Sequence, residues 1–190
     1  QFPYSAIEDN IGEFFQTGTT FQNTVSLSTG NLETGYVFLS ANSTDIEFII
    51  KNDQAKRNTF NVKGGKKMGN WTLEGNASYI TSRTEQSTGS LYLELLQTAT
   101  NIPVEEFSSP NNATHWTSYY RSPYWVRDNE RTADRYDIFS GIANVQYQFN
   151  ENISAGYNAN IRARQKNFLS YFNGDVNNKQ IGCHELSSYG

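Results

Sequence analysis

The chain has 190 residues, of which 36% are hydrophobic, 14% aromatic and 18% charged, and its net charge is −4. The hydrophobic share is low for a soluble domain with a large core, and the charged share is low for a disordered chain. The negative charge argues against a nucleic-acid-binding domain, and no apolar stretch is long enough for a transmembrane helix. The composition suits a transmembrane β-barrel, although a polar secreted β-domain has similar statistics.

Six segments in which apolar and polar residues alternate with a period of two follow one another along the chain, and this alternation predicts strands. They cover residues 19–29, 36–43, 57–66, 71–81, 137–149 and 153–164. In 36–43 both faces are apolar, so its orientation stays open. The strong segments have about ten residues, enough for a tilted strand to cross a bilayer, whereas strands of soluble sheets average about five or six.

The connections between these segments alternate between short and long. Residues 30–34, 67–70 and 150–152 have the Gly or Asn residues of hairpin turns, whereas 44–56, 83–135 and the chain after 165 are long. Short turns at one end and long loops at the other are typical of outer-membrane barrels. We therefore predict an all-β fold: an antiparallel up-and-down transmembrane β-barrel segment of about six strands in three hairpins.

Aromatic residues fall near both ends of the predicted strands, as in the interfacial girdles of barrels. Phe21, Phe60, Tyr79 and Phe139 lie toward the long loops, and Trp71, Tyr147 and Phe149 toward the short turns. The alternative is that strands are rich in aromatic residues in any fold.

The long connector 83–135 contains a second set of features. Leu91, Leu95 and Leu96 predict a short helix that ends before Pro103, and residues 115–125 contain five aromatic residues. Aromatic rings stack on sugars and also anchor protein interfaces, so this cluster is the candidate for ligand or partner contact. The alternative that we favour is packing of the loop against itself or the barrel rim. The cluster consists of Trp116, Tyr119, Tyr120, Tyr124 and Trp125.

Several short stretches follow one another in a recognisable order along the chain. They are Asn10-Ile11-Gly12-Glu13-Phe14-Phe15-Gln16-Thr17-Gly18, Asn23-Thr24-Val25-Ser26-Leu27-Ser28, Lys56-Arg57-Asn58-Thr59-Phe60-Asn61-Val62, Leu91-Tyr92-Leu93-Glu94-Leu95-Leu96-Gln97-Thr98-Ala99-Thr100-Asn101-Ile102, Ser122-Pro123-Tyr124-Trp125 and residues 131–136. Together they resemble the SusC/RagA family of TonB-dependent outer-membrane transporters. The resemblance covers roughly residues 3–172, and the tail 173–190 matches nothing in that family.

The resemblance implies a bacterial outer-membrane barrel of about 22 strands with a plugged lumen. It also implies a SusD-like surface lipoprotein as partner, energy from the TonB complex acting on the plug, and import of oligosaccharides or peptides. Within this scheme we expect a lead-in at 1–18, four strands in 19–82, an extracellular loop at 83–135, two strands in 136–164 and a loop or frayed tail at 165–190, without the plug. The rivals are a passive porin and a secreted β-sandwich adhesin or carbohydrate-binding module.

The sequence offers no catalytic constellation, so we expect neither an enzyme nor a cofactor. His115 and His184 have no nearby nucleophile and third partner, and Cys183 beside His184 is too small a set for a metal site. Glu105 and Glu106 are consecutive, whereas glycosidase carboxylates face each other across a cleft.

The polar side of segment 153–164 supplies the candidates for lining the lumen. Arg162 and Arg164 are expected nearer the rim, paired with carboxylates. The full set is Asn158, Asn160, Arg162 and Arg164.

Overall fold

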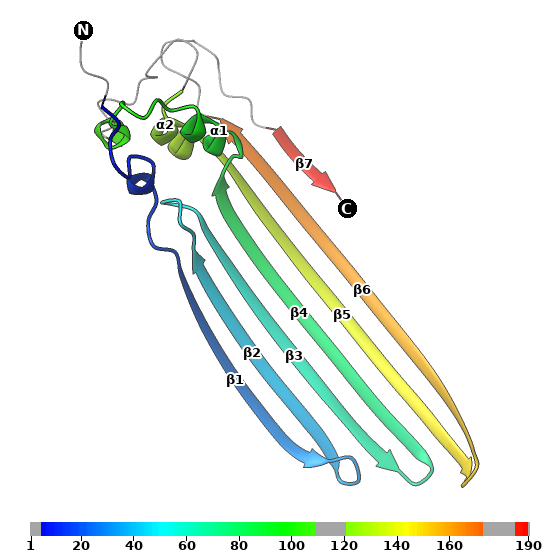
Figure 1. Ribbon diagram of the computed structural model, residues 1–190. Helices are drawn as coiled ribbons and strands as arrows, with labels where there is room; N and C mark the ends of the chain where they lie inside the picture. The colour runs from blue at the N-terminus through cyan, green and yellow to red at the C-terminus, as the bar shows by residue number, and fades with distance from the viewer. Residues whose placement is uncertain (1–4, 109–120, 173–184, 190) are drawn as a thin grey trace.

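The computed structural model describes residues 5–108, 121–172 and 185–189. Its strands form one antiparallel sheet in which each strand pairs with its neighbours along the chain. Figure 1 shows the strands side by side in a single curved layer, with β1 and β7 at the two edges. The predicted all-β, antiparallel up-and-down fold is therefore confirmed, and within the described residues the sheet is open. The strands are β1 Thr19–Asn31, β2 Gly35–Glu47, β3 Gln54–Met68, β4 Trp71–Ser87, β5 Glu130–Asn150, β6 Ile153–Phe172 and β7 Glu185–Tyr189.

The strands extend further toward the long loops than the alternation predicted. β4 and β5 stay paired as far as Ser87 and Arg131, so the predicted loop 83–135 is shortened at both ends. Likewise β6 runs to Phe172 and pairs with β7, so residues 165–172 and 185–189 of the predicted tail are strand. Near the long loops both faces of these strands are polar. Backbone pairing continues there, but apolar and polar residues no longer alternate, so the sequence pattern does not reveal the strand.

The register divides the strands into two faces, because directly opposite residues of an antiparallel pair point to the same side. Leu27 lies opposite Leu39 and Val25 opposite Ala41, which settles the orientation of β2. We call this side the apolar face, and the side that carries the alternate residues the polar face. The apolar face includes Phe21, Val25, Leu27, Val37, Leu39, Ala41, Phe60, Val62, Trp71, Leu73, Ala77, Tyr79, Phe139, Ala143, Val145, Tyr147, Ala155, Tyr157, Ala159 and Ile161.

The three hairpin turns lie at one end of the sheet (Figure 1). At the β1–β2 turn Gly30 has φ +79°, and a Cβ there would lie 1.9 Å from the Gly35 carbonyl oxygen. The Asn31 side-chain oxygen accepts hydrogen bonds from the backbone N–H groups of Glu33 and Thr34 at 3.0 and 2.9 Å. These contacts fix the register of the first hairpin, as tight turns do.

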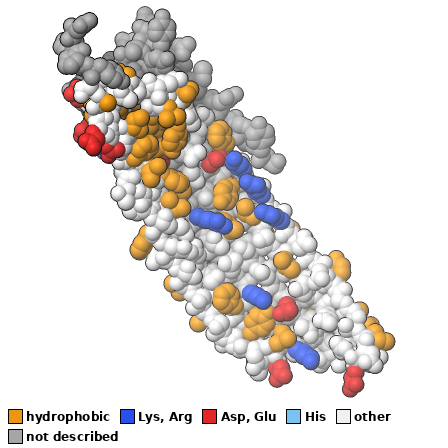
Figure 2. Space-filling model, viewed as in Figure 1, with side chains coloured by type: hydrophobic (Ala, Val, Ile, Leu, Met, Phe, Trp, Pro, Cys, Tyr) orange, Lys and Arg blue, Asp and Glu red, His pale blue; other side chains and the backbone are white. Residues whose placement is uncertain are grey.

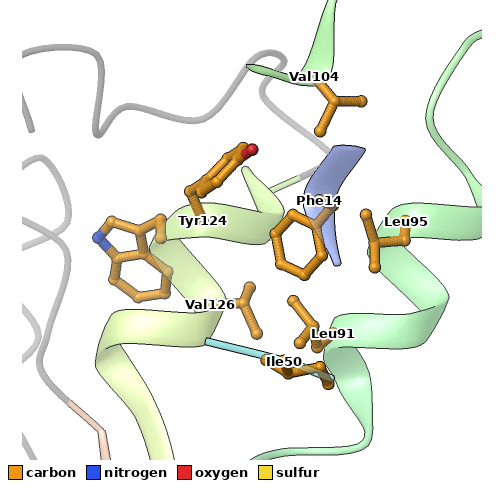
Figure 3. Packing of buried hydrophobic residues seen from close by; sticks show 8 residues of the cluster. Phe14, Ile50, Leu91, Leu95, Val104, Tyr124 and Val126 are labelled. Atoms are coloured by element: carbon orange, nitrogen blue, oxygen red, sulfur yellow. The ribbon is translucent and has the colours of Figure 1, made fainter. Parts of the chain in front are cut away.

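The opposite end of the sheet carries the helices: α1 Ser90–Leu96, α2 Pro123–Asn129, and the 3₁₀ turns η1 Gly12–Phe14 and η2 Val104–Ser108. The short helix predicted around Leu91 is confirmed as α1, and α2 was not predicted. Figure 3 shows the buried hydrophobic cluster that these segments enclose, and no strand of the sheet contributes to it. We call this unit the cap. Its cluster consists of Phe14, Ile50, Leu91, Leu95, Val104, Tyr124, Trp125 and Val126.

Candidate functional site

The apolar face has no second layer over it among the described residues. Phe21, Val25 and Leu27 of β1 are 66%, 73% and 63% exposed, and Tyr157 and Ile161 of β6 are 71% and 62% exposed. In a soluble sheet these positions would be the core, because burying such side chains is the main driving force of folding. Here the eight buried hydrophobic residues all belong to the cap. A solvent-exposed apolar sheet face of this extent marks a surface that contacts protein or lipid.

Aromatic rings bound the apolar face at two heights. Toward the cap, Phe60, Tyr79 and Phe139 lie directly opposite one another on three neighbouring strands. Toward the hairpins, the ring of Tyr147 lies 4.6 Å from that of Trp71 and 4.8 Å from that of Phe149. Phe139 and Phe149 are both on β5, and their separation corresponds to about 33 Å of strand, or about 25 Å of height at a barrel's tilt. That height matches the apolar band of outer-membrane barrels.

On the same face, charged pairs replace the apolar residues immediately beyond the aromatic row that lies toward the cap. Lys56 Nζ lies 3.0 Å from Asp45 Oδ1, Arg135 Nε lies 3.5 Å from Asp137 Oδ2, and Arg83 pairs with Glu85. The three cationic side chains are 60% to 70% exposed, and ions are costly within hydrocarbon. The apolar band therefore ends sharply, at the height where water would begin.

The cap contains two members of the predicted aromatic cluster. Tyr124 and Trp125 of α2 are only 8% and 7% exposed, and the Tyr124 ring packs edge-on against Phe14 at 4.9 Å. Desolvation by the surrounding residues raises the pKa of the Tyr124 hydroxyl. These two residues thus pack the loop, as in the alternative favoured from the sequence. Trp116, Tyr119 and Tyr120 lie outside the described residues.

Buried ion pairs, which sequence reasoning missed, fasten the cap to the strand ends. Asp53 accepts hydrogen bonds from the backbone N–H and the hydroxyl of Ser87 at 2.8 and 2.9 Å, and its Oδ1 lies 3.2 Å from Arg131 Nη2. Arg121 bridges the buried carboxylates of Glu94 in α1 and Glu130 at the start of β5. Arg121 precedes Glu130 by nine residues, and the other partners lie 27 or more residues apart along the chain, so no local pattern could have revealed them.

The four lumen candidates of β6 all lie on the polar face and are exposed. The Arg164 guanidinium lies 5.9 Å from the centre of the Tyr136 ring. The carboxylate partners predicted for Arg162 and Arg164 are absent among the described residues; instead Lys166, one step further along the same face, pairs with Asp134 at 3.4 Å. The candidates are Asn158, Asn160, Arg162 and Arg164.

Chemistry at other acidic residues is limited. Among the residues that the structure describes, no group of three or more His, Cys, Asp or Glu side chains could hold a metal ion. Glu105 and Glu106 lie exposed in η2, and a hydrogen bond from the Glu13 carboxyl to Glu105 raises the pKa of Glu13. His115, Cys183 and His184 fall outside the described residues.

No protein-family model matches the chain, and no curated protein is significantly similar to it. None of the helices in the described ranges is long and apolar enough to cross a bilayer. The two faces of the sheet and the cap are therefore the features from which a function can be inferred.

Proposed function

We propose that this chain is part of a SusC/RagA-type TonB-dependent transporter of the bacterial outer membrane. In this proposal the apolar face contacts lipid, the polar face lines the lumen and the cap faces the outside. The observation that carries it is the uncovered apolar face, bounded by aromatic rows about 25 Å apart in height. The transporter would import oligosaccharides or peptides, with a SusD-like lipoprotein as partner and the TonB complex as energy source.

The secreted β-sandwich is the rival that the geometry disfavours. A sandwich packs a second sheet about 10 Å from the first, so its apolar strand positions are covered. Val25 and Ala159 are exposed and Val145 is half-buried, and the only hydrophobic cluster of the described residues is in the cap. The long strands are a second argument, because β5 has 21 residues, far more than the strands of soluble sheets.

Paired arginine substitutions on adjacent positions of one strand test the lipid contact. Ala143 lies midway along the apolar face and Asn144, its neighbour, points to the polar face. In the intact outer-membrane protein, Ala143→Arg should destabilise the folded barrel by about 2–4 kcal/mol, because arginine at the bilayer midplane costs that much. The matched control Asn144→Arg should cost little, since the polar face is open to water.

The readout is the heat-modifiable mobility of the folded barrel in detergent, followed against temperature. Ala159→Arg and Asn160→Arg on β6 provide a second pair with the same arrangement. Equal tolerance on both faces would contradict the lipid contact, as would a monomeric protein that is stable in buffer without detergent.

The passive porin is separated from the transporter by energy dependence. Cells that need this protein for growth on an oligosaccharide or peptide should lose that growth when TonB is deleted. Growth that persists without TonB, while it still requires this protein, would identify a porin instead.

A further inference from the structure

The polar face carries a concentration of positive charge that the composition of the chain does not predict. Strands β1 to β6 hold six Lys and Arg residues on this face but only three Asp and Glu residues, whereas the chain as a whole has a net charge of −4. Figure 2 looks onto this face and shows Lys and Arg side chains gathered in the half nearer the helices. The cations are Arg57, Lys63, Lys67, Arg162, Arg164 and Lys166, and the carboxylates are Glu74, Glu130 and Asp134.

The carboxylates leave most of these cations uncompensated. Glu130 is buried in the cap, where Arg121 neutralises it, and Glu74 accepts a hydrogen bond from the Tyr36 hydroxyl at 2.8 Å. Asp134 pairs with Lys166 at 3.4 Å. Arg57 and Arg162 are exposed and form neither an ion pair nor a hydrogen bond with any residue that the structure describes.

The cations stand among groups that suit a hydroxyl-rich solute. The row that begins at Arg162 continues across the sheet through hydroxyl and amide side chains only, without an apolar residue on which a protein segment would pack. One row further toward the cap, Arg164 lies opposite Ile138, and its guanidinium lies 5.9 Å from the centre of the Tyr136 ring in the row after that. The row consists of Arg162, Ser140, Ser78, Asn61, Ser40 and Ser26.

We propose that the polar face of β3 to β6 is an anion-attracting wall, which makes the barrel favour solutes that carry carboxylate or sulfate groups. The inference rests on the proposed barrel, because only there does this face line a passage. A passage lined by one sign of charge raises the local concentration of oppositely charged solutes by about tenfold or more. The cations lie mostly toward the cap, so they would act where a solute enters from outside.

Thiol modification at one reporter position measures this potential directly. Ser140 points to the polar face directly opposite Arg162, so Ser140→Cys places a thiol within the row. In the intact protein, purified in folded form from outer membranes, the anionic sulfonatoethyl methanethiosulfonate should modify this thiol about tenfold faster than the cationic trimethylammonioethyl reagent. The preference should shrink as salt is raised, because salt screens exposed charges. Protein without the Ser140→Cys change gives the background from Cys183.

Two triple variants provide the comparison. Neutralising the wall with Arg162→Gln, Arg164→Gln and Lys166→Gln should abolish the preference for the anionic reagent. Neutralising three cations at a similar height on the apolar face should preserve the preference for the anionic reagent. That matched control changes Lys56, Arg83 and Arg135 to Gln.

Each possible result of the thiol modification either supports or overturns the anion-attracting wall. Equal rates for the two reagents would show that the wall does not attract anions, and no reaction with either would show that another protein segment covers it; both results overturn the inference. Ser78→Cys, in the same row on β4, serves as the reporter if Ser140→Cys does not fold. If the membrane assignment itself is wrong, the arginine variants at Ala143 and Asn144 would be tolerated equally on the two faces. That result distinguishes failure of the membrane assignment from failure of the anion-attracting wall.

Discussion

Replacing Arg131 should destabilise the cap more than replacing any charged residue on the surface. Arg131 lies 3.2 Å from Asp53 and donates hydrogen bonds to the backbone carbonyls of Asn52 at 2.6 Å and Arg127 at 2.9 Å. It thereby ties the β2–β3 loop and α2 to the start of β5. Both members of the ion pair are buried, with side-chain exposures of 9% and 6%. Arg131→Met would therefore leave the Asp53 carboxylate buried and without a cation.

Breaking a buried ion pair on one side costs about 3–5 kcal/mol. At about 1.4 kcal/mol per factor of ten, the opening equilibrium of the cap should rise by roughly two to three and a half orders of magnitude. Amide hydrogen exchange of the intact protein, followed by mass spectrometry over the β2–β3 loop and α2, measures that opening. Arg135→Met is the matched control: the Arg135 side chain is 62% exposed, and surface pairs contribute at most about 1 kcal/mol.

Restoring charge balance should rescue much of the loss. The double variant Asp53→Asn with Arg131→Met removes the stranded carboxylate and should exchange more slowly than Arg131→Met alone. Unchanged exchange in Arg131→Met, or a double variant that exchanges faster than the single one, would refute the reasoning that an uncompensated charge is the cause.

Three further predictions concern the cap and the first turn. Leu91→Ala should cost about 2–5 kcal/mol in cap stability by hydrogen exchange, because Leu91 is fully buried, whereas Leu96→Ala, at 78% exposed on the same helix, should change little. Gly30→Ala should destabilise the first hairpin by more than about 1 kcal/mol, since its positive φ and the Gly35 carbonyl exclude a Cβ; a lower temperature of heat-modifiable unfolding would show this. The raised pKa of Glu13 means that its contact with Glu105 is stabilising below the ordinary value of 4.5 and is lost as pH rises through the folded value. Glu13→Gln should therefore raise the cap's melting temperature at pH 7 and not at pH 4, and an equal gain at both would contradict the assignment.

The part of the fold that the sequence could predict is the part whose side chains alternate between two environments. From Trp71 to Tyr79 and from Phe139 to Phe149, apolar and polar residues alternate mostly one by one, and both strands were placed correctly. The alternation ends where the charged pairs begin, as at Arg83 and Arg135, because both faces of the strands are polar there. The strands nevertheless continue through backbone hydrogen bonds, which leave no periodic trace in the sequence.

The cap was harder to predict because its contacts join distant segments. Leu91 and Leu95 have helical spacing, so α1 could be located, and Pro123 is a common first residue of a helix. The aromatic side chains of α2 could equally have been exposed for binding or buried for packing. In the structure these side chains are buried in a cluster with Phe14, Ile50 and Val104, which come from three other parts of the chain.

In the proposed outer-membrane barrel, the cap and the apolar face would together let one sheet be stable in both lipid and water. Between the aromatic rows the strands need no partner layer if lipid supplies it, and the backbone groups of β2 to β5 there pair with neighbouring strands on both sides, as a bilayer requires. Beyond Phe139, β5 continues toward the cap for about 30 Å of strand, where lipid no longer covers it. Strands in water need a hydrophobic core or ion pairs to remain ordered. The cluster around Leu91 and the pair between Asp53 and Arg131 lie at that end, so in the proposed barrel the cap would stabilise the portion of the sheet that lipid does not cover.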